Sequence, residues 1–584
     1  MNLRFQLNAI FLLVTGVGLA GADTPQWSFQ PLAANALPGK VDSPWVKTPV
    51  DSFILARLED HGLVPQVEVD RHSLIRRVTA GLTGLPPSVG QIRAFVSDAS
   101  PDAYTRLINR LLESPHYGER WGRHWLDVAR FGESNGTLTV NEDKVRGDAW
   151  QYRDAVTRAF NADLPFNQFV RFQFIDPPDD KKQYRPLRQF IHLGTRLQNN
   201  ANPNDKQFHR LDDMVSTTGN AFLGLTFGCA RCHDHPVDPM STEEYYRFTA
   251  VFFDQVRESP KASAKKIALH ITEPRLLLRG SWANPGRAVG PGFLGKLMSQ
   301  PVGYWQGKGR NNLESLADWL TDTGHGAGEQ LARVIVNRIW HHHFGRGLVA
   351  TPNDFGRLGS RPSHPLLLDW LAVQLIEGGW NLKPLHRLIL TSAVYRQSSS
   401  RDVVTLKRDA DNRWLWEYRP RRLEAEIIRD HLLAVAGVLR TDMFGKSIPV
   451  GNYKKREDDR PESWRRSIYL QAHRAVRHPT LSLFDPPDTE RSDGARTTAS
   501  SPDSALFALN SPLVWKLAEH FAKRVEKEAG SDRVRQVEHA YLLALCRPPR
   551  KNEVEIGVQF LRTGNTLIDY THMIFGLNEF IYVH

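Results

Sequence analysis

Apolar residues recur at the spacing of an α-helix along most of the first half of the chain. Within residues 71–83, the apolar positions Leu74, Ile75, Val78 and Leu82 share one side of a helix, because residues three or four apart face the same way. The same periodicity predicts further helices at 49–58, 101–112, 118–131, 150–174 with an interruption at Leu164-Pro165, 211–227 and 242–253. We therefore expect the first half to consist of packed helices.

The second half shows the same pattern together with clear stop signals. The helical segment 331–344 is followed by Gly345, and the segment 365–377 is followed by Gly378. Glycine suits the left-handed conformation in which many helices end. Further helices are predicted at 385–395, 422–439, 502–527, 533–545 and 552–561.

Between residues 266 and 297 the helical pattern gives way to short apolar runs broken by polar residues, glycine and proline. This texture predicts a few short strands. A chain of 584 residues is too long for one core, since cores stop growing near about 250–300 residues. The predicted fold is mainly α, with two helical domains joined by a small β-containing segment. The predicted boundaries are a signal peptide at 1–22, an N-terminal helical domain at 23–262, a linker with short strands at 263–325 and a C-terminal helical domain at 326–584.

The N-terminus has the pattern of a secretory signal. Arg4 precedes an apolar run at 9–20, and Ala20-Gly21-Ala22 has the small-residue pattern of a cleavage site. The alternative is an uncleaved anchor, but this run is short for a bilayer, which needs about 20 apolar residues. No other segment is long and apolar enough to span. We expect a protein of the periplasm or cell envelope with no transmembrane span in the mature chain.

The chain is basic, with a formal net charge of +11 at pH 7. Such a balance suits haem propionates, an acidic redox partner protein, or a sulfated or carboxylated polysaccharide. A solvated surface rich in arginine is the alternative explanation. Nucleic acid is not an expected partner, because an exported chain without a recognised binding motif has no use for one.

The strongest chemical signal is the pentapeptide at 229–233, Cys-Ala-Arg-Cys-His. Two thiols at this spacing can add to the two vinyl groups of one porphyrin, and the adjoining histidine can ligate the iron. The motif predicts covalent haem c held by Cys229, Cys232 and His233. Candidates for the sixth ligand are Met240, Met214, His209 and His192. Without one of them, the open position could bind a small molecule or support oxidative chemistry.

Two other interpretations of the motif stay open. Cysteines and histidines at this spacing also suit zinc or another divalent metal, with His233, His235 and Asp238 as further ligands. A plain disulfide between Cys229 and Cys232 in an oxidising compartment is the third interpretation. The remaining cysteine, Cys546, belongs to an apolar helical stretch and is expected to be an inert core thiol.

Two predicted helices that contain histidines are further candidates for ligand binding. Trp121 and Trp125 lie one helical turn apart, near His124, and could pack a porphyrin or a sugar ring, although a buried helix with an internal ion pair is the simpler expectation. In the run 341–343 three consecutive histidines point about 100° apart, so they cannot share one ion. We expect them at a helix end, where imidazoles suit the negative terminus. Hydrolase, nucleotide-binding and zinc-protease signatures are absent from the sequence.

Several long motifs resemble a family of exported planctomycete proteins with two domains of unknown function, of the cytochrome C-associated PSCyt/PSD type. The resemblance lies in residues 48–54, 82–87, 114–121, 229–239, 336–340, 342–349, 353–356 and 578–583. It implies an exported, mostly helical architecture and a redox association. Many relatives carry a separate cytochrome domain upstream, which this chain lacks, so only Cys229, Cys232 and His233 carry the haem motif over.

Three functional hypotheses follow. The first is an exported c-type haem protein that transfers electrons or performs a redox step in the cell envelope. The second is a metal-dependent enzyme that acts on carbohydrate-like substrates through His233, His235 and Asp238. The third is a non-catalytic scaffold protein of the envelope in which the cysteines form a disulfide.

Overall fold

The structure is a computed structural model that describes residues 26–33, 37–38, 43–136, 143–197, 201–256, 272–307, 309–449, 460–497 and 502–584. The predicted signal peptide lies outside the described residues, as does the segment 263–271 of the predicted linker.

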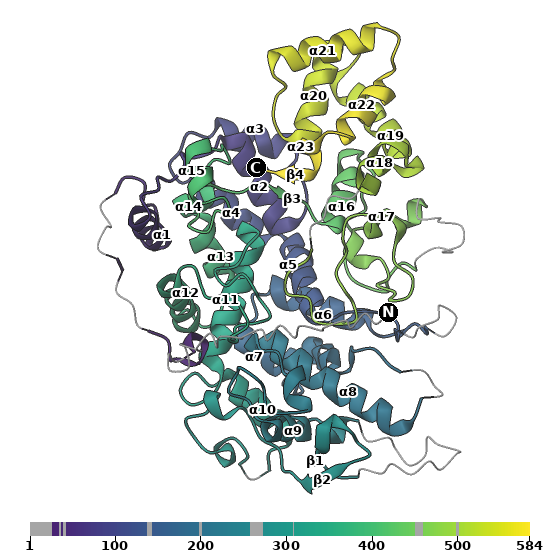
Figure 1. Cartoon of the computed structure of the whole chain (residues 1–584). Coiled ribbons are helices and arrows are strands. Elements are labelled where there is room, and N and C mark those ends of the chain that lie inside the picture. Colours follow the sequence, from purple (N-terminus) through teal and green to yellow (C-terminus); the bar gives the residue numbers. More distant parts are fainter. Residues whose placement is uncertain are drawn as a thin grey trace, which may run out of the picture.

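The described chain is mainly α-helical, as the sequence predicts (Figure 1). Its helices are α1 (Pro49–Asp60), α2 (Arg71–Thr83), α3 (Val89–Ser97), α4 (Ala103–Glu113), α5 (Pro115–Val128), α6 (Trp150–Asn161), α7 (Phe166–Arg171), α8 (Pro203–Thr218), α9 (Thr242–Val251), α10 (Asn312–Thr321), α11 (Gly328–Phe344), α12 (Pro365–Glu377), α13 (Leu382–Leu390), α14 (Ala393–Arg396), α15 (Val403–Arg408), α16 (Ala425–Val435), α17 (Pro479–Ser482), α18 (Pro502–Asn510), α19 (Pro512–Ala529), α20 (Arg533–Leu545), α21 (Lys551–Arg562), α22 (Leu567–Phe575) and α23 (Asn578–Ile581).

Two small antiparallel sheets complete the described elements. The hairpin of β1 (Arg275–Leu277) and β2 (Pro285–Ala288) lies in the segment where short strands are expected. The second sheet pairs β3 (Arg421–Arg422) with β4 (Tyr582–Val583), two segments that are far apart in sequence. The fold class is thus mainly α with a small β-containing segment.

The ends of the helices follow from their capping residues. α11 ends at Gly345, which takes the left-handed conformation at φ +80°, as expected for a C-terminal glycine. α12 covers the predicted range and begins with a proline, whose missing N–H is not needed in the first turn. The prediction of one helix over 502–527 is wrong, since Pro512 cannot donate to the preceding turn and a new helix, α19, begins there.

Two apolar cores hold the described helices together. The larger core draws most of its buried residues from Val50 to Tyr418, so α10–α14 pack with the N-terminal helices. The smaller core draws mainly on residues from Leu423 to Val583. In Figure 1, α8, α9, β1 and β2 lie at one end of the molecule, α19–α22 lie at the other, and α5, α6 and α11 lie between them.

Within the described ranges, none of the helices combines the length and the apolar composition that a membrane crossing requires.

Candidate functional site

The cysteine motif forms an exposed turn near the β1–β2 hairpin. Its first cysteine lies in the 3₁₀ turn Gly228–Arg231, and the chain then leads to α9. A π-helical turn, Gly219–Leu223, ends α8, and Gly224 at φ +59° redirects the backbone toward the motif. Cys229 and Cys232 are both exposed and carry free thiols. These two sulfur atoms are therefore accessible to a reactant from solvent.

His233 is also exposed, and its ring orientation is set by a hydrogen bond. Its Nδ1 lies 2.7 Å from the carbonyl oxygen of Asp234. Because a carbonyl only accepts, Nδ1 carries the proton and Nε2 keeps the lone pair. A histidine whose second nitrogen donates to a carbonyl has the tautomer of a typical metal ligand.

Three polar contacts fix the turn to the helices beneath it. The hydroxyl of Tyr246 donates to the carbonyl of Arg231 over 2.9 Å. The Arg231 guanidinium lies 3.5 Å from the carboxylate of Asp212, and that carboxylate accepts a 2.5 Å hydrogen bond from the hydroxyl of Tyr245. The turn is thus exposed but anchored.

The turn also lies against the segment that follows β1. A Cβ atom added at Gly280 would lie 2.7 Å from Sγ of Cys232, and Gly280 has φ +71°. Leu278, two residues earlier, is 55% exposed, and Val237, just beyond the motif, is 36% exposed. Apolar side chains therefore lie at the surface in both segments next to the thiols.

His235 and Asp238 lie in the interior. Nδ1 of His235 accepts a 2.9 Å hydrogen bond from the backbone N–H of Asp238. The Asp238 carboxylate accepts a 2.7 Å hydrogen bond from the backbone N–H of Arg357. His235 thus holds the shape of the motif loop, and Asp238 ties its end to the loop after α11.

The four candidates for a sixth ligand occupy different environments. Met214 and Met240 are buried among apolar side chains of the larger core. His209, on α8, is half-buried, and His192 is exposed.

A second set of donors meets in the interior, where α5, α11 and the residue before α16 come together. His124 and His342 stack with their ring centroids 3.5 Å apart. Together with Glu424 they are the one group of three among the described His, Cys, Asp and Glu residues whose ligand atoms all lie within 4.8 Å of one another. The geometry brings together residues that no sequence motif links.

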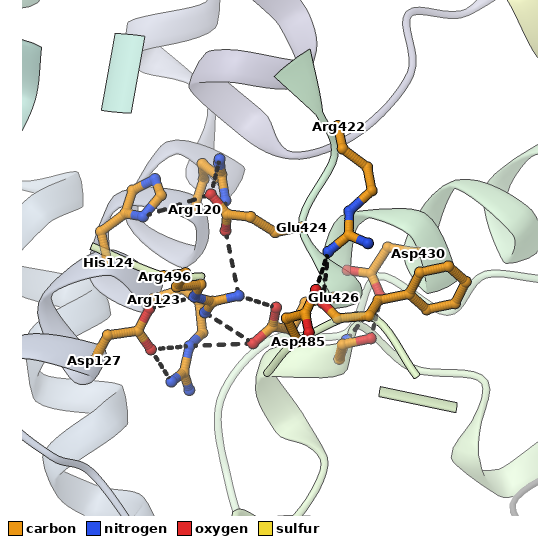
Figure 2. A network of polar contacts seen from close by, with 12 residues as sticks. Arg120, Arg123, His124, Asp127, Arg422, Glu424, Glu426, Asp430, Asp485 and Arg496 are labelled. Carbon is orange, nitrogen blue, oxygen red and sulfur yellow. Dashed lines mark hydrogen bonds and ion pairs between the residues drawn. The ribbon is translucent and has the colours of Figure 1, made fainter. Parts of the chain in front are cut away.

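The carboxylate of Glu424 is held by arginines. Arg120 donates to its two oxygens over 2.6 and 3.0 Å, and Arg496 lies 3.5 Å away. Figure 2 shows Glu424 between these two arginines, with His124 beside it. Burial alone would raise the pKa of Glu424, but Arg120 outweighs this effect and holds the pKa well below its usual range.

The two imidazoles are neutral at physiological pH. Burial and the neighbouring Arg120 lower the pKa of His124 well below that of a free imidazole. Burial and the stacked His124 ring do the same to the pKa of His342. A neutral imidazole has a lone pair on one nitrogen and can therefore bind a metal ion.

His342 and Glu424 face a large cavity. Its volume is about 590 Å³, in the size range of small-molecule sites. Its walls carry seven arginine side chains but only two carboxylates, Asp411 and Glu424. Tyr582 of β4 also lines it. The electrostatics of this cavity therefore favour an anionic occupant.

The three consecutive histidines point to different places at the end of α11, as expected for successive helical residues. His342 stacks on His124, His343 makes a 2.8 Å hydrogen bond to His386, and His341 lines the cavity. The three imidazoles do not converge on one ion, although His341 and His342 both line the cavity.

Several other residues, among them the two tryptophans and the cysteine considered from the sequence, have structural roles. Trp121 and Trp125 are each 3% exposed, so neither presents a free face to a sugar or porphyrin. Arg130 pairs with Asp213 through two hydrogen bonds of 2.5 and 2.7 Å. Cys546 is buried, and burial raises the pKa of its thiol to about 11, as expected for an inert core thiol.

Sequence reasoning did not find the set formed by His124, His342 and Glu424. In the sequence, His124 and His342 belong to two unrelated motifs, and Glu424 belongs to no recognised motif. The available signal was the arrangement of Arg120 and His124 one turn apart on α5, which places a cation and an imidazole on the same helical face.

Both halves of the chain match known protein families. Residues 49–258 match PSCyt2, a protein of unknown function (DUF1549), and residues 312–561 match PSD1, a protein of unknown function (DUF1553). No curated protein and no solved structure matches the chain.

Proposed function

We propose that this chain, whose two halves match the PSCyt2 and PSD1 families, is a c-type haem protein. In this proposal it is exported to the periplasm or cell envelope, where it transfers electrons or performs a redox step. Cys229, Cys232 and His233 would hold the haem.

The observation that carries the proposal is the state of the three side chains. Both thiols are free and exposed on one anchored turn. The hydrogen bond from Nδ1 of His233 to the Asp234 carbonyl leaves Nε2 with its lone pair. Two accessible thiols beside a histidine in the ligating tautomer are what covalent haem attachment requires of a protein.

The neighbouring residues suit a flat apolar group. Leu278 and Val237 expose apolar surface in the segments next to the thiols, and burying that surface under a macrocycle would be favourable. Gly280 leaves room beside Cys232, since any larger side chain there would approach Sγ. When bound, the haem supplies a one-electron redox centre whose potential depends on its axial ligands.

The geometry favours haem over a metal bound by His233, His235 and Asp238. His235 and Asp238 are buried and hydrogen-bonded within the loop, whereas His233 is exposed. Gathering all three around one ion would require the loop to open and release its contact with Arg357.

The test is to express the chain in a host with haem-attachment machinery and to record the spectrum of the exported protein after denaturation. We expect a pyridine haemochrome spectrum that persists, because thioether bonds survive unfolding. The double variant Cys229→Ala/Cys232→Ala is expected to lose this signal, while Cys546→Ala, a matched control at the buried thiol, keeps it. A wild-type protein without haem, or a double variant that stays coloured, would contradict the proposal.

A further inference from the structure

The imidazole of His124 is a buried polar group whose hydrogen-bonding capacity is not satisfied by its described neighbours. It is 5% exposed, and neither of its ring nitrogens has a hydrogen-bond partner within the part of the chain that the structure describes. Burying a polar group without a partner costs about 1–3 kcal/mol, and most buried polar side chains avoid it. The imidazole of His124 is therefore available to bind a ligand.

Two further donors lie next to that imidazole. Nδ1 of His124 is 4.0 Å from Oε1 of Glu424, and a ligand atom of His342 completes a set that spans at most 4.8 Å. A tetrahedral ion with bonds of about 2.1 Å holds its ligands about 3.4 Å apart. The distances thus suit one ion, but the His124 and His342 rings, which stack at an interplanar angle of 23°, must rotate apart so that their nitrogen lone pairs converge on it.

The surroundings orient one of these donors directly. Glu424 receives two hydrogen bonds from Arg120, and a ligating carboxylate in a metal site is held by outer hydrogen bonds of this kind. The backbone of His342 is fixed by a 2.6 Å hydrogen bond from Arg421 to its carbonyl.

The three arginines Arg120, Arg123 and Arg496, which lie next to the donors, are paired with carboxylates. Arg496 donates to Glu426 over 2.6 Å and to Asp127 over 2.7 Å. Arg123 also pairs with Asp127. Within this network the arginines Arg120, Arg123 and Arg496 are balanced by the carboxylates Asp127, Glu424 and Glu426, as Figure 2 shows.

We propose that His124, His342 and Glu424 bind one divalent transition-metal ion such as Zn²⁺, and that its open coordination position faces the arginine-lined cavity, where an oxyanion binds. Two imidazoles and one carboxylate are an established ligand set for zinc with a fourth, exchangeable position. This centre is separate from the haem motif and does not depend on it.

The cavity determines the class of the fourth ligand. His342 and Glu424 lie in its wall, together with seven arginines. Arg346 and Arg361, two of these, are exposed. A guanidinium binds carboxylate or sulfate oxygens through paired N–H groups, so an oxyanion can bind both the metal and the wall.

The experiment uses the full chain carrying Cys229→Ser and Cys232→Ser, which removes the motif thiols and any haem colour. One equivalent of Co²⁺, a spectroscopic substitute for Zn²⁺, is added and the visible absorption is recorded. We expect one tightly bound ion with the intense absorption of a four-coordinate site. His342→Ala is expected to weaken binding about tenfold or more, whereas His341→Ala, a control from the same helix and cavity, changes it less than about twofold.

Glu424→Gln provides a second test that keeps the shape of the side chain, in case His342→Ala fails to fold, with circular dichroism to check each variant. Absence of Co²⁺ and Zn²⁺ binding in the background chain overturns the proposal, as does unchanged binding in folded Glu424→Gln.

The oxyanion is tested by adding acetate or sulfate to the Co²⁺-loaded chain. We expect the absorption bands to shift, and Arg346→Ala to raise the anion concentration needed without lowering the metal content. A spectrum that neither anion changes overturns the assignment of the cavity as the ligand site.

Discussion

Cys229, Cys232 and His233 lie on one exposed turn, whereas His124, His342 and Glu424 come from three separate elements and meet in the interior. On the turn, the donors are available because solvent surrounds them. In the interior, the imidazole of His124 is available because the described residues leave its nitrogens without partners. Donor atoms can thus be kept available by exposure to solvent or by burial without a hydrogen-bond partner.

This difference has a consequence for mutation. The exposed turn can change its chemistry with little effect on the rest of the fold. The interior set shares its helices with buried ion pairs and both apolar cores, so changes around it affect global stability as well. The predictions below test this contrast.

The largest decrease in the free energy of unfolding is expected for Arg466→Met. Arg466 is 3% exposed and pairs with Glu119 on α5 over 2.8 Å and with Asp430 on α16 over 3.0 Å. Removing it leaves two buried carboxylates without their main partner, which lowers the free energy of unfolding by about 3–5 kcal/mol. Urea-induced unfolding measures the change.

The matched control comes from the exposed turn. Arg231 lies 3.5 Å from Asp212, and both side chains are more than 30% exposed. Arg231→Ala is expected to lower the free energy of unfolding by less than about 1 kcal/mol. If Arg231→Ala and Arg466→Met lowered the free energy of unfolding equally, the exposed turn and the interior would not differ in their contribution to stability.

The second-largest decrease in the free energy of unfolding is expected when the pH is lowered. Burial lowers the pKa of His364 and of His386 to about 3, whereas an unfolded histidine has a pKa near about 6.5. Between these values the unfolded chain binds more protons than the folded chain, so stability falls as the pH falls. From pH 7 to pH 5 each histidine lowers the free energy of unfolding by about 2 kcal/mol.

Urea unfolding at the two pH values measures this loss. His364→Asn, which keeps a polar side chain before α12, is expected to lose about 2 kcal/mol less over the same range. A free energy of unfolding that stays constant from pH 7 to pH 5 would show that these imidazoles are not held neutral by burial.

A smaller effect is expected for Asp238→Ala, which removes the acceptor that binds the Arg357 backbone. Loss of a hydrogen bond to a charged group costs about 1.5–3 kcal/mol. Covalent haem should be retained, because Asp238 is not a haem ligand in the proposal. Asp238→Asn keeps an acceptor oxygen and should lose less stability. Loss of the haemochrome signal in a folded Asp238→Ala variant would speak for the competing metal interpretation.

Apart from the control variants, the smallest loss of stability is expected for Gly280→Ala, which should also reduce haem attachment. The methyl group would press against Sγ of Cys232, and the left-handed backbone at φ +71° costs an alanine about 1–2 kcal/mol. The fraction of chains with attached haem, measured by mass spectrometry, should decrease. Gly290→Ala, where a Cβ has no neighbour within 4 Å, is the control and should match the wild type.

Much of the fold could be predicted because helical periodicity and end signals are local properties. α2 covers the predicted residues 71–83, and α12 covers 365–377 between a proline and a glycine. The prediction was wrong at 502–527, where apolar spacing continues across a proline that breaks the helix. The sharing of one core by the N-terminal helices and α10–α14 could not be predicted, since it depends on contacts between distant segments.

The same distinction applies to the sites. Cys229, Cys232 and His233 are adjacent in sequence, so their spacing alone predicted a cofactor. His124, His342 and Glu424 come together only through the packing of α5, α11 and α16. The sequence correctly indicated that His341, His342 and His343 diverge, but not that His342 would meet a histidine from α5.

The β3–β4 ladder has a consequence for how the cavity arises. Arg421 and Arg422 pair with Tyr582 and Val583, and Glu424 follows directly. Contacts between such distant segments form late, since a long loop must close first. A partly folded chain in which only the larger core has formed thus has His124 and His342 but lacks Glu424, so the proposed metal site would be complete only after the ladder closes.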